Sequence, residues 1–234
     1  MRSKQAVVLL SGGLDSATAL YLARSQGYVC SCLIFDYQQR HRREIEDAKR
    51  IAQKARCKFQ VIKIRLPWKG SALLDKKIRL PTATDLRPTA IPLTYVSARN
   101  IIFLSFALSY AEAIGARAIF IGAHTQDYSN YPDCRPEFFR AFARVVTFGT
   151  RSGVEQERIA IKTPLIHKGK AEIIRLGAKL GVPFALTWSC YRGGKRPCGR
   201  CDSCHYRAKG FREAGINDPL TNEGRLSNQS EGCP

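Results

Sequence analysis

Two groups of residues in this chain have the types and the spacing that chemistry requires. The first is the run SGGLDS at residues 11–16, which follows a short apolar stretch and opens a helical pattern. Two glycines let the backbone turn tightly and bring its N–H groups close to a ligand. A helix that starts at such a turn adds unpaired N–H donors and the positive end of its dipole. The run therefore predicts a loop that binds phosphate groups, with Asp15 placed to hold a Mg²⁺ ion that bridges them.

This glycine loop differs from two common phosphate-binding motifs. It lacks the Gly-Lys-Ser/Thr ending of the Walker loop, and it lacks the G-x-G-x-x-G pattern of the dinucleotide-binding turn. It resembles instead the SGG-x-D-S loop of the PP-loop ATP pyrophosphatases, which bind ATP and usually release pyrophosphate after forming an adenylate. The less specific interpretation is an ordinary strand–turn–helix in which Asp15 or Ser16 caps the helix.

The second group is a set of four closely spaced cysteines: Cys190, Cys198, Cys201 and Cys204. Four thiolates at this spacing suit tetrahedral zinc, and a site closed by four sulfur ligands is structural because it leaves no open position. Nearby cations such as Arg192 and Lys195 favour the thiolate form. An iron–sulfur cluster is the alternative. The surrounding segment holds few apolar residues, so we expect the metal to attach it to the rest of the chain.

The elements that position these two groups alternate between strands and helices. Apolar patterns predict strands at 5–10, 28–35, 59–64, 118–123 and 159–163, and helices at 15–25, 42–55, 100–114, 136–146 and 170–180. This order predicts an α/β fold, a parallel sheet with helices on both faces. Residues 66–93 hold four prolines and are expected to form a long loop or lid, and 124–135 a second loop. We divide the chain into a nucleotide-binding domain at 1–187 and a zinc-binding segment with its tail at 188–234.

Composition limits the class of protein. The chain has 234 residues, of which 44% are hydrophobic and 24% charged, as in ordinary globular proteins. The apolar runs are shorter than the roughly 18 residues that a membrane helix needs, and the first one is too short for a secretory signal. We therefore expect a cytoplasmic protein with reduced cysteines. The net charge of +19 favours anionic partners such as ATP and is compatible with nucleic acid, or it serves only solubility.

The loop and the cysteines belong to a wider resemblance. The chain is similar to the 7-cyano-7-deazaguanine synthase family over most of its length, and the YPDCRPEF run at 131–138 is its most specific piece. Ser97 and Ala98 depart from the pattern, because proline and glycine are expected there, and the local turn is in question. The matching runs are SGGLDS at 11–16, FDYQQRH at 35–41, VSARN at 96–100, DYSNYPDCRPEF at 127–138, TPL at 163–165 with Lys168, and the four cysteines.

The resemblance implies a Rossmann-like fold of the adenine nucleotide alpha hydrolase type and an ATP-dependent ligase of queuosine or archaeosine biosynthesis. Such an enzyme takes 7-carboxy-7-deazaguanine, ammonia and ATP. It adenylates the carboxylate, forms an amide, then activates and removes the amide oxygen to leave the nitrile. Adenylation suits this task because a carboxylate is a poor electrophile and its oxygen a poor leaving group. The resemblance also implies Mg²⁺ with ATP, one structural Zn²⁺ per chain, and a homodimer.

Site residues follow from the same resemblance. A guanine-like edge offers two donors to a carboxylate, and a substrate carboxylate suits an arginine fork, so Asp133, Arg135 and Tyr131 are expected at the base. For each residue a local role stays open. Asp133 and Arg135 form a salt bridge in that case, Arg99 and Asn100 cap a helix, Asp36 belongs to a turn, and Lys168 is a solvated lysine. The catalytic residues expected are Asp15, Lys168 and Arg99, and those expected to bind ATP are Leu10, Ser11, Gly12, Gly13, Leu14, Asp15, Ser16, Asp36 and Asn100.

Three further residues and two other functions remain open. Cys134 has no evident activating partner, so packing is expected of it, while His41 and His124 either move protons or only make hydrogen bonds. A PP-loop tRNA-modifying enzyme would keep the fold and adenylate a base carbonyl; the charge favours it, and the lack of a separate RNA-binding domain opposes it. A zinc-containing nucleic-acid-binding module would show salt-dependent RNA binding without turnover, but the intact glycine loop opposes that function.

Overall fold

A parallel sheet forms the centre of the computed structural model, which describes residues 4–82, 84, 90–124 and 130–221. Its five strands lie in the order β3-β2-β1-β4-β5, and every neighbouring pair is parallel. The predicted α/β fold with a parallel sheet is therefore confirmed. The strands are β1 (Gln5–Leu9), β2 (Val29–Asp36), β3 (Lys58–Lys63), β4 (Ala118–Phe120) and β5 (Ala160–Lys162).

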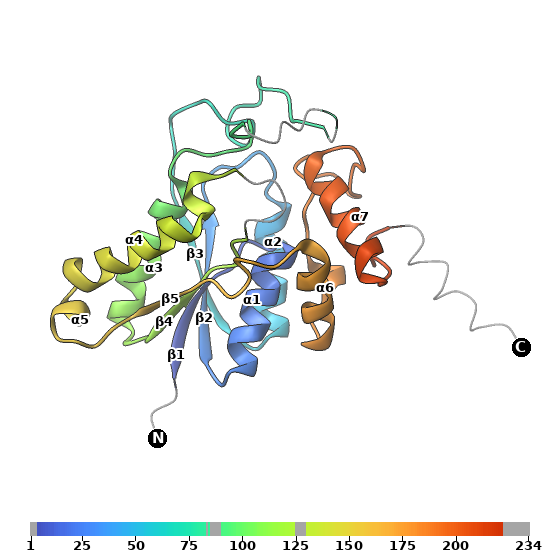
Figure 1. Cartoon of the computed structure of the whole chain (residues 1–234). Coiled ribbons are helices and arrows are strands. Elements are labelled where there is room, and N and C mark those ends of the chain that lie inside the picture. Colours follow the sequence, from blue (N-terminus) through green and yellow to red (C-terminus); the bar gives the residue numbers. More distant parts are fainter. Residues whose placement is uncertain (1–3, 83, 85–89, 125–129, 222–234) are drawn as a thin grey trace, which may run out of the picture.

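Helices cover both faces of this sheet (Figure 1). One face carries α1 (Leu14–Ser25), α2 (Arg43–Lys54) and α6 (Lys170–Lys179), with α7 (Asp202–Ala214) packed on α6. The other face carries α3 (Arg99–Ala113), α4 (Pro136–Gly149) and the short α5 (Arg151–Val154). Two 3₁₀ turns, η2 (Pro132–Cys134) and η3 (Phe184–Leu186), lie in the connections. In the part of the chain that the structure describes, no helix has the length and apolar character to cross a bilayer.

The side chains of β1 divide the apolar interior into two cores. Ala6 and Val8 pack with α1, α2 and α6, whereas Val7 and Leu9 pack with α3 and α4. After the exposed Gln5, the strand is apolar at every position because both faces of a parallel sheet are covered. The central strand is thus fixed from two sides, and so is the loop that follows it.

The strand order places that loop at the point where ligands bind in this class of fold. The chain runs outward from β1 to β3 and then returns to β4, so the order changes direction between β1 and β4. In open α/β sheets, ligands bind outside the carboxyl ends of the strands at such a point. Gly122, which follows β4, allows the close approach, because a side chain there would collide with the backbone of Asp15.

The sequence analysis missed α7. This helix starts directly after Cys201 and ends before Gly215, whose φ of 70° suits a helix end. Phe211 of α7 lies in the same core as α1 and α6. The helix was hard to see because it buries few apolar side chains among many charged ones. Residues 83 and 85–89 of the predicted lid, 125–129 of the second predicted loop, and the tail after 221 with Cys233 lie outside the described residues.

A buried ion pair holds α7 in place. Arg207 Nε donates to Asp218 Oδ2 at 2.7 Å, and Arg207 Nη2 donates to Asp218 Oδ1 at 2.9 Å. The remaining Nη1 group donates to Thr187 Oγ1 at 2.8 Å, which ties α7 to the segment before the cysteines. Both charged side chains are almost completely buried, at 5% and 6% exposure. Because no water replaces a lost partner there, each charge depends on the other.

The substitution Asp218→Asn is expected to lower the free energy of unfolding by roughly 3–5 kcal/mol, since Arg207 keeps a buried and uncompensated charge. Glu155→Gln is the matched control, because its partner Arg151 is 80% exposed, and it should cost less than about 1 kcal/mol. Urea unfolding followed by circular dichroism measures both variants. If both variants lost the same free energy of unfolding, the buried pair of Arg207 and Asp218 would stabilise the protein no more than an exposed ion pair does.

Candidate functional site

A pocket of about 340 Å³ opens at the carboxyl ends of β1, β2 and β4. This volume falls within the usual range for small-molecule sites, which is roughly 300–1,000 Å³. Apolar side chains of the strands line one part of the pocket. Polar groups come from three other segments: the glycine loop, the start of α3, and the cysteine segment at 188–207.

The glycine loop is held in shape by its own hydrogen bonds. Ser16 Oγ accepts a hydrogen bond from Ser11 N at 3.1 Å and donates to Gly13 O at 3.0 Å. Gly12 has a φ of 84°, and a side chain there would collide with the carbonyl oxygen of Glu44 in α2. Glycine is therefore required at this position. The loop delivers the first N–H groups of α1, which have no acceptors within the helix, to the edge of the pocket.

Asp15 lies in a cluster of charged groups inside the pocket. Lys170 Nζ is 3.0 Å from each carboxylate oxygen of Asp15, and His124 Nε2 is 3.0 Å from Lys170 Nζ. Burial acts to raise the pKa of Asp15, but Lys170 and His124 outweigh it and hold that pKa well below its usual range. The carboxylate therefore stays ionised at physiological pH, and its negative charge keeps the lysine beside the glycine loop.

The lysine that reaches the pocket is Lys170, not the predicted Lys168. Lys168 is half-buried in the turn before α6, where its N–H donates to Leu165 O at 2.9 Å, and it does not line the pocket. Lys170 is the first residue of α6, which follows β5. A helix that returns from β5 begins at the carboxyl edge of the sheet, so its first turn faces the site. That rule identifies Lys170 once the boundary of α6 is known.

Arg99 and Asn100 open α3 and line the pocket, as the sequence analysis expected. Ala98 precedes them with a φ of 53°, in the left-handed region that glycine favours. Its N–H donates to Tyr95 Oη at 3.0 Å, so the turn forms with alanine where glycine is expected. Arg99 Nη1 donates to Tyr37 Oη at 3.3 Å. No carboxylate of the described residues lies within ion-pair distance of Arg99, which leaves the guanidinium available to an anionic ligand.

The residues expected at the base substrate separate in the structure. Tyr131 lines the pocket, with its Oη 2.6 Å from Thr94 Oγ1. Asp133 is buried, and its Oδ2 accepts from Asn100 N at 2.9 Å, so its carboxylate caps α3. Arg135 is exposed before α4 and does not line the pocket. Asp133 thus takes a local role, but its partner is a backbone N–H of α3 and not Arg135, for which the sequence analysis left a salt bridge open.

Asp36 and Cys134 also take local roles. Asp36 ends β2 outside the main pocket, where Oδ1 accepts from Gln38 N at 3.2 Å and Oδ2 lies 3.7 Å from Arg42 Nη2. Cys134 lines the pocket, and its Sγ accepts from Asn100 Nδ2 at 3.2 Å. Burial and the neighbouring Asp133 raise the pKa of Cys134 to about 12. A thiol that stays protonated is a weak nucleophile, in keeping with the packing role expected of it.

His41 and Glu44 add a second polar pair to the pocket lining. His41 is buried, and its Nδ1 lies 4.0 Å from Glu44 Oε2 without a hydrogen-bond partner among the described residues. Gln39 Nε2 donates to Glu44 Oε1 at 2.9 Å. Burial raises the pKa of Glu44, although His41 and Gln39 oppose that rise. The pair is able to accept or hold a proton within the pocket; the sequence analysis left this role open for His41 but did not identify Glu44 as its neighbour.

The four cysteine side chains converge on one point. Their sulfur atoms all lie within 4.8 Å of one another, and Cys198 Sγ is 4.0 Å from Cys204 Sγ. A tetrahedral zinc with bonds of about 2.3 Å would place its sulfur ligands about 3.8 Å apart. The N–H groups of Arg192 and Cys198 donate to Cys190 Sγ at 3.4 and 3.3 Å, which favours a thiolate. The donor set therefore fits a tetrahedral metal ion.

The cysteine segment forms one side of the pocket as well. Trp188 N donates to Gly12 O at 2.9 Å, which joins this segment directly to the glycine loop. The guanidinium of Arg43 lies 3.7 Å from the centre of the Trp188 ring, and its Nη1 donates to the carbonyl of Lys195 at 2.8 Å. Tyr191 and Asp202 belong to this cysteine segment, and both line the pocket. The sequence analysis expected attachment of the segment but did not expect it to build the site.

The family of the chain follows from comparison with known proteins. The family model described as "Queuosine biosynthesis protein QueC" matches residues 5–215. The chain belongs to the QueC family. A relative named 7-cyano-7-deazaguanine synthase from Trichodesmium erythraeum is 53% identical over 220 residues, which cover 92% of this chain and 99% of the relative. One named 7-cyano-7-deazaguanine synthase 2 from Desulfitobacterium hafniense is 56% identical over 218 residues, covering 93% and 92%. The resemblance seen in the sequence is therefore confirmed.

Two solved structures share the fold of this QueC-family chain. NMN synthetase from Francisella tularensis has a TM-score of 0.50 at 15% identity, covering 100% of this chain and 90% of that one. A 4-thiouridine synthetase in complex with RNA and ATP has a TM-score of 0.51 at 19% identity, covering 97% of this chain and 54% of that one. At these identities the likeness concerns the fold alone.

The substitution Cys201→Ser is expected to release the bound metal and to destabilise the protein, because Cys201 is buried and is also the residue from which α7 starts. A loss of about 3 kcal/mol would lower Tm by roughly 6–12 °C for a protein of this size. Elemental analysis by plasma mass spectrometry and a thermal melt measure the two effects. Cys57→Ser, outside the cluster, should keep its metal; a Cys201→Ser variant with full metal content and unchanged Tm would refute the assignment.

Proposed function

We propose that this chain converts 7-carboxy-7-deazaguanine and ammonia into 7-cyano-7-deazaguanine at the expense of ATP. One observation carries the proposal. A glycine loop of the ATP-pyrophosphatase type faces a pocket that holds Lys170 and Arg99, in a chain more than half identical to relatives named 7-cyano-7-deazaguanine synthase. Cations beside such a loop suit a reaction in which phosphate groups are bound and one of them is attacked.

The glycine loop is proposed to hold the triphosphate of ATP. The first N–H groups of α1 and the hydroxyl of Ser11 would donate to phosphate oxygens, and Lys170 would neutralise part of their charge. Mg²⁺ usually keeps several waters and takes one or two carboxylates together with substrate phosphates. Asp15 fits that pattern as a single acidic ligand, although Lys170 already contacts both of its oxygens. We therefore expect ATP to bring the ion, with Asp15 and Lys170 sharing the charge around it.

The proposed chemistry has two stages at one place in the pocket. A substrate carboxylate oxygen attacks the α-phosphorus and pyrophosphate leaves; ammonia then attacks the acyl carbon, and AMP leaves with formation of the amide. In the second stage the amide oxygen attacks the α-phosphorus of a second ATP and pyrophosphate leaves; loss of both N–H protons and of AMP then gives the nitrile. Arg99 is proposed to bind the reacting carboxylate and to stabilise the charge on the departing phosphate. The pair His41 and Glu44 is proposed to take up the protons.

We further propose that the metal in the cysteine cluster is zinc, one per chain. Four thiolate ligands leave no open position, so the ion would have a structural role and would not touch the substrate. Residues 188–234 would then be a zinc-binding attachment to the nucleotide-binding part at 1–187. Reduced thiolates agree with a cytoplasmic location.

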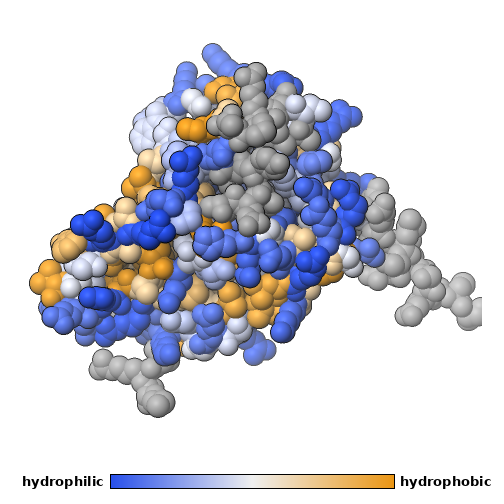
Figure 2. All heavy atoms as spheres, in the orientation of Figure 1, coloured by the Kyte–Doolittle hydropathy of each residue, from blue (hydrophilic) through white to orange (hydrophobic). Residues whose placement is uncertain are grey.

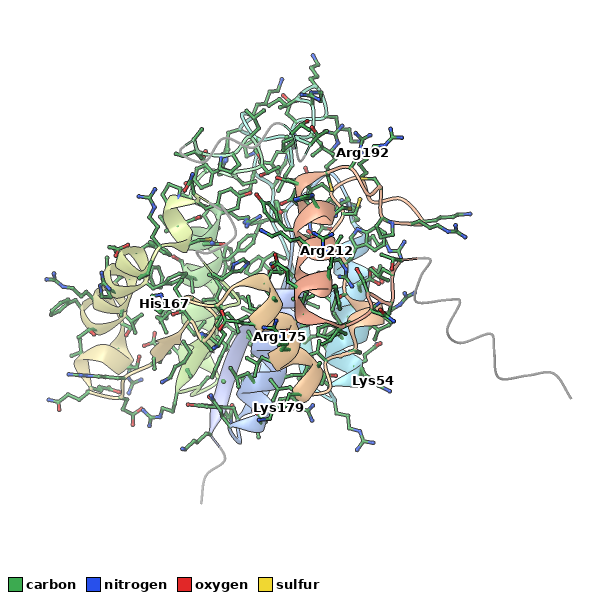
Figure 3. The ribbon with its side chains drawn as sticks, turned by 45° about the vertical axis from the view of Figure 1, so that its right-hand side comes forward. Lys54, His167, Arg175, Lys179, Arg192 and Arg212 are labelled. Carbon is green, nitrogen blue, oxygen red and sulfur yellow. The ribbon has the colours of Figure 1, made fainter. Side chains whose placement is uncertain are left out.

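The surface suggests two further features of the proposed enzyme. Apolar side chains gather over α4 and α5 in Figure 2, among them Phe148 at 75% and Val154 at 74% exposure. Such a patch suits a subunit interface, and we propose a homodimer. Basic side chains labelled in Figure 3, such as Arg175 and Lys179 of α6 and Arg212 of α7, lie away from that patch. The proposed reaction needs no nucleic acid, but this charge is compatible with one.

The decisive experiment is mass spectrometry of the product formed from 7-carboxy-7-deazaguanine, ammonium and ATP. We expect the nitrile, with two AMP and two pyrophosphate released per product. Asp15→Asn and Lys170→Met should each reduce AMP release by at least about 100-fold, because each disturbs the charge balance at the phosphate loop. Glu46→Gln, an exposed acid on α2, is the control and should keep normal rates. Release of AMP with bulk tRNA but not with the acid would favour a tRNA-modifying enzyme instead.

The dimer is tested by sedimentation equilibrium. The wild type should have twice the 26.2 kDa mass of one chain. Phe148→Glu should yield monomers, since a buried charge at an apolar interface is costly, and Phe106→Glu on α3 reports whether the interface extends that far. A wild type that sediments as a single chain at micromolar concentration would contradict the proposal.

A further inference from the structure

One carboxylate in the pocket lacks a cation. Asp202, the first residue of α7, is only 7% exposed and lines the pocket. Its Oδ1 accepts from Ser203 N at 2.6 Å, and no lysine, arginine or histidine of the described residues lies within ion-pair distance. A charge that is nearly buried is costly unless hydrogen-bond donors surround it. Among the described residues no donor is bonded to Oδ2, so this oxygen suits the N–H groups of a bound molecule.

The other acidic side chains at the pocket already have partners in the protein. Asp15 has Lys170 on both oxygens, and Glu44 accepts from Gln39 Nε2. Asp133, which the sequence analysis expected at the base, does not line the pocket; it accepts from Asn100 N and caps α3. Asp202 is thus the acidic residue that is left for a ligand with N–H donors.

The surroundings of Asp202 fit a flat ligand with donors at one end and an anion at the other. Tyr131 and Tyr191 line the same pocket as Asp202 and Arg99, so the walls of that pocket offer a ligand two aromatic rings, a carboxylate and a guanidinium. A 7-carboxy-7-deazaguanine ring has its exocyclic amine and its 7-carboxylate at opposite ends. The aromatic faces of the tyrosines suit the flat ring, and the carboxylate of Asp202 suits the amine end. The guanidinium of Arg99 suits the acid end.

We propose that Asp202 is the specificity residue of the site and accepts the ring N–H and the exocyclic amine of the guanine-type base. The 7-carboxylate then points toward Arg99 and the phosphate loop. This inference rests on the proposed function and deepens it, because it names the group that distinguishes a guanine-type base from one without the amine. It also gives the cysteine segment a direct part in substrate recognition, since α7 starts from a metal-ligand cysteine.

The test compares two substrates and two enzymes. The substrates are 7-carboxy-7-deazaguanine and the same acid without the exocyclic amine. The wild type should prefer the first by about 10- to 100-fold in kcat/KM, as expected for a lost hydrogen bond to a charged group. Asp202→Asn should raise KM for the first substrate by a similar factor, leave KM for ATP within about 3-fold, and discriminate between the two acids by less than about 3-fold.

Asp133→Asn is the matched control, because it changes the other buried aspartate in the same way. It is expected to lower Tm but to keep the preference of the wild type for the amine-bearing acid. Metal content and Tm of Asp202→Asn should match the wild type, which separates recognition from a role at the start of α7. Equal discrimination by wild type and Asp202→Asn, or loss of discrimination in Asp133→Asn alone, would overturn the assignment.

Isothermal titration separates this inference from the proposed function. Binding of 7-deazaguanine, with and without its amine, needs no turnover. If the wild type binds the amine-bearing base better and Asp202→Asn does not, the assignment stands even where no nitrile forms and the proposed reaction fails. Nitrile formation together with equal binding of both bases by the wild type would overturn the assignment and leave the reaction intact.

Discussion

The site depends on the junction at Gly12, where three segments meet at one backbone position. The Gly12 carbonyl accepts the N–H of Trp188, and its α-carbon lies so close to α2 that a side chain would collide with Glu44 O. The residue thereby joins the glycine loop, the helix α2 that carries Glu44, and the cysteine segment. Any displacement of the segment would pull on the loop, because a closely packed interior transmits small shifts. The positions of the glycine loop and of the cysteine segment are therefore coupled.

The four-cysteine cluster helps to hold the cysteine segment in this position. The cysteine segment at 188–207 buries few apolar groups, so hydrophobic packing alone cannot fix it. Three other kinds of interaction do so: the convergence of four cysteines, the stacking of Arg43 on Trp188 at 3.7 Å, and the buried pair of Arg207 with Asp218. Each holds a different part of the segment, and together they orient the first turn of α7 toward the pocket. Under the proposed function, a metal ion in the cluster would therefore affect substrate recognition by positioning the start of α7.

The sequence predicts the scaffold and the loop well because both follow from short-range rules. Apolar runs broken by turns gave the strands and their parallel order, and glycine spacing gave the phosphate loop. Three features of the structure were not predicted. Lys170 enters the pocket instead of Lys168 because the start of α6, not the nearby motif, decides which side chain faces the sheet edge. The carboxylate of Asp133 caps α3 and does not face the pocket, because it accepts a hydrogen bond from Asn100 N. That N–H belongs to a residue more than 30 positions earlier in the sequence. The helix α7 was missed because it buries few apolar side chains, so its sequence shows no apolar period.

The residues around the pocket come from two sources, the sheet with its helices and the cysteine segment. The solved structures that share this fold agree with the chain at 15% and 19% identity, so the likeness concerns the sheet and its helices. In this chain the glycine loop follows a strand end and Arg99 opens α3, whereas Tyr191 and Asp202 come from the cysteine segment, outside the sheet. Under the proposed function, the groups that activate the substrate would therefore lie where the sheet fixes them. The groups that select the substrate would lie on a segment that is held to the glycine loop by the hydrogen bond from Trp188 N to Gly12 O.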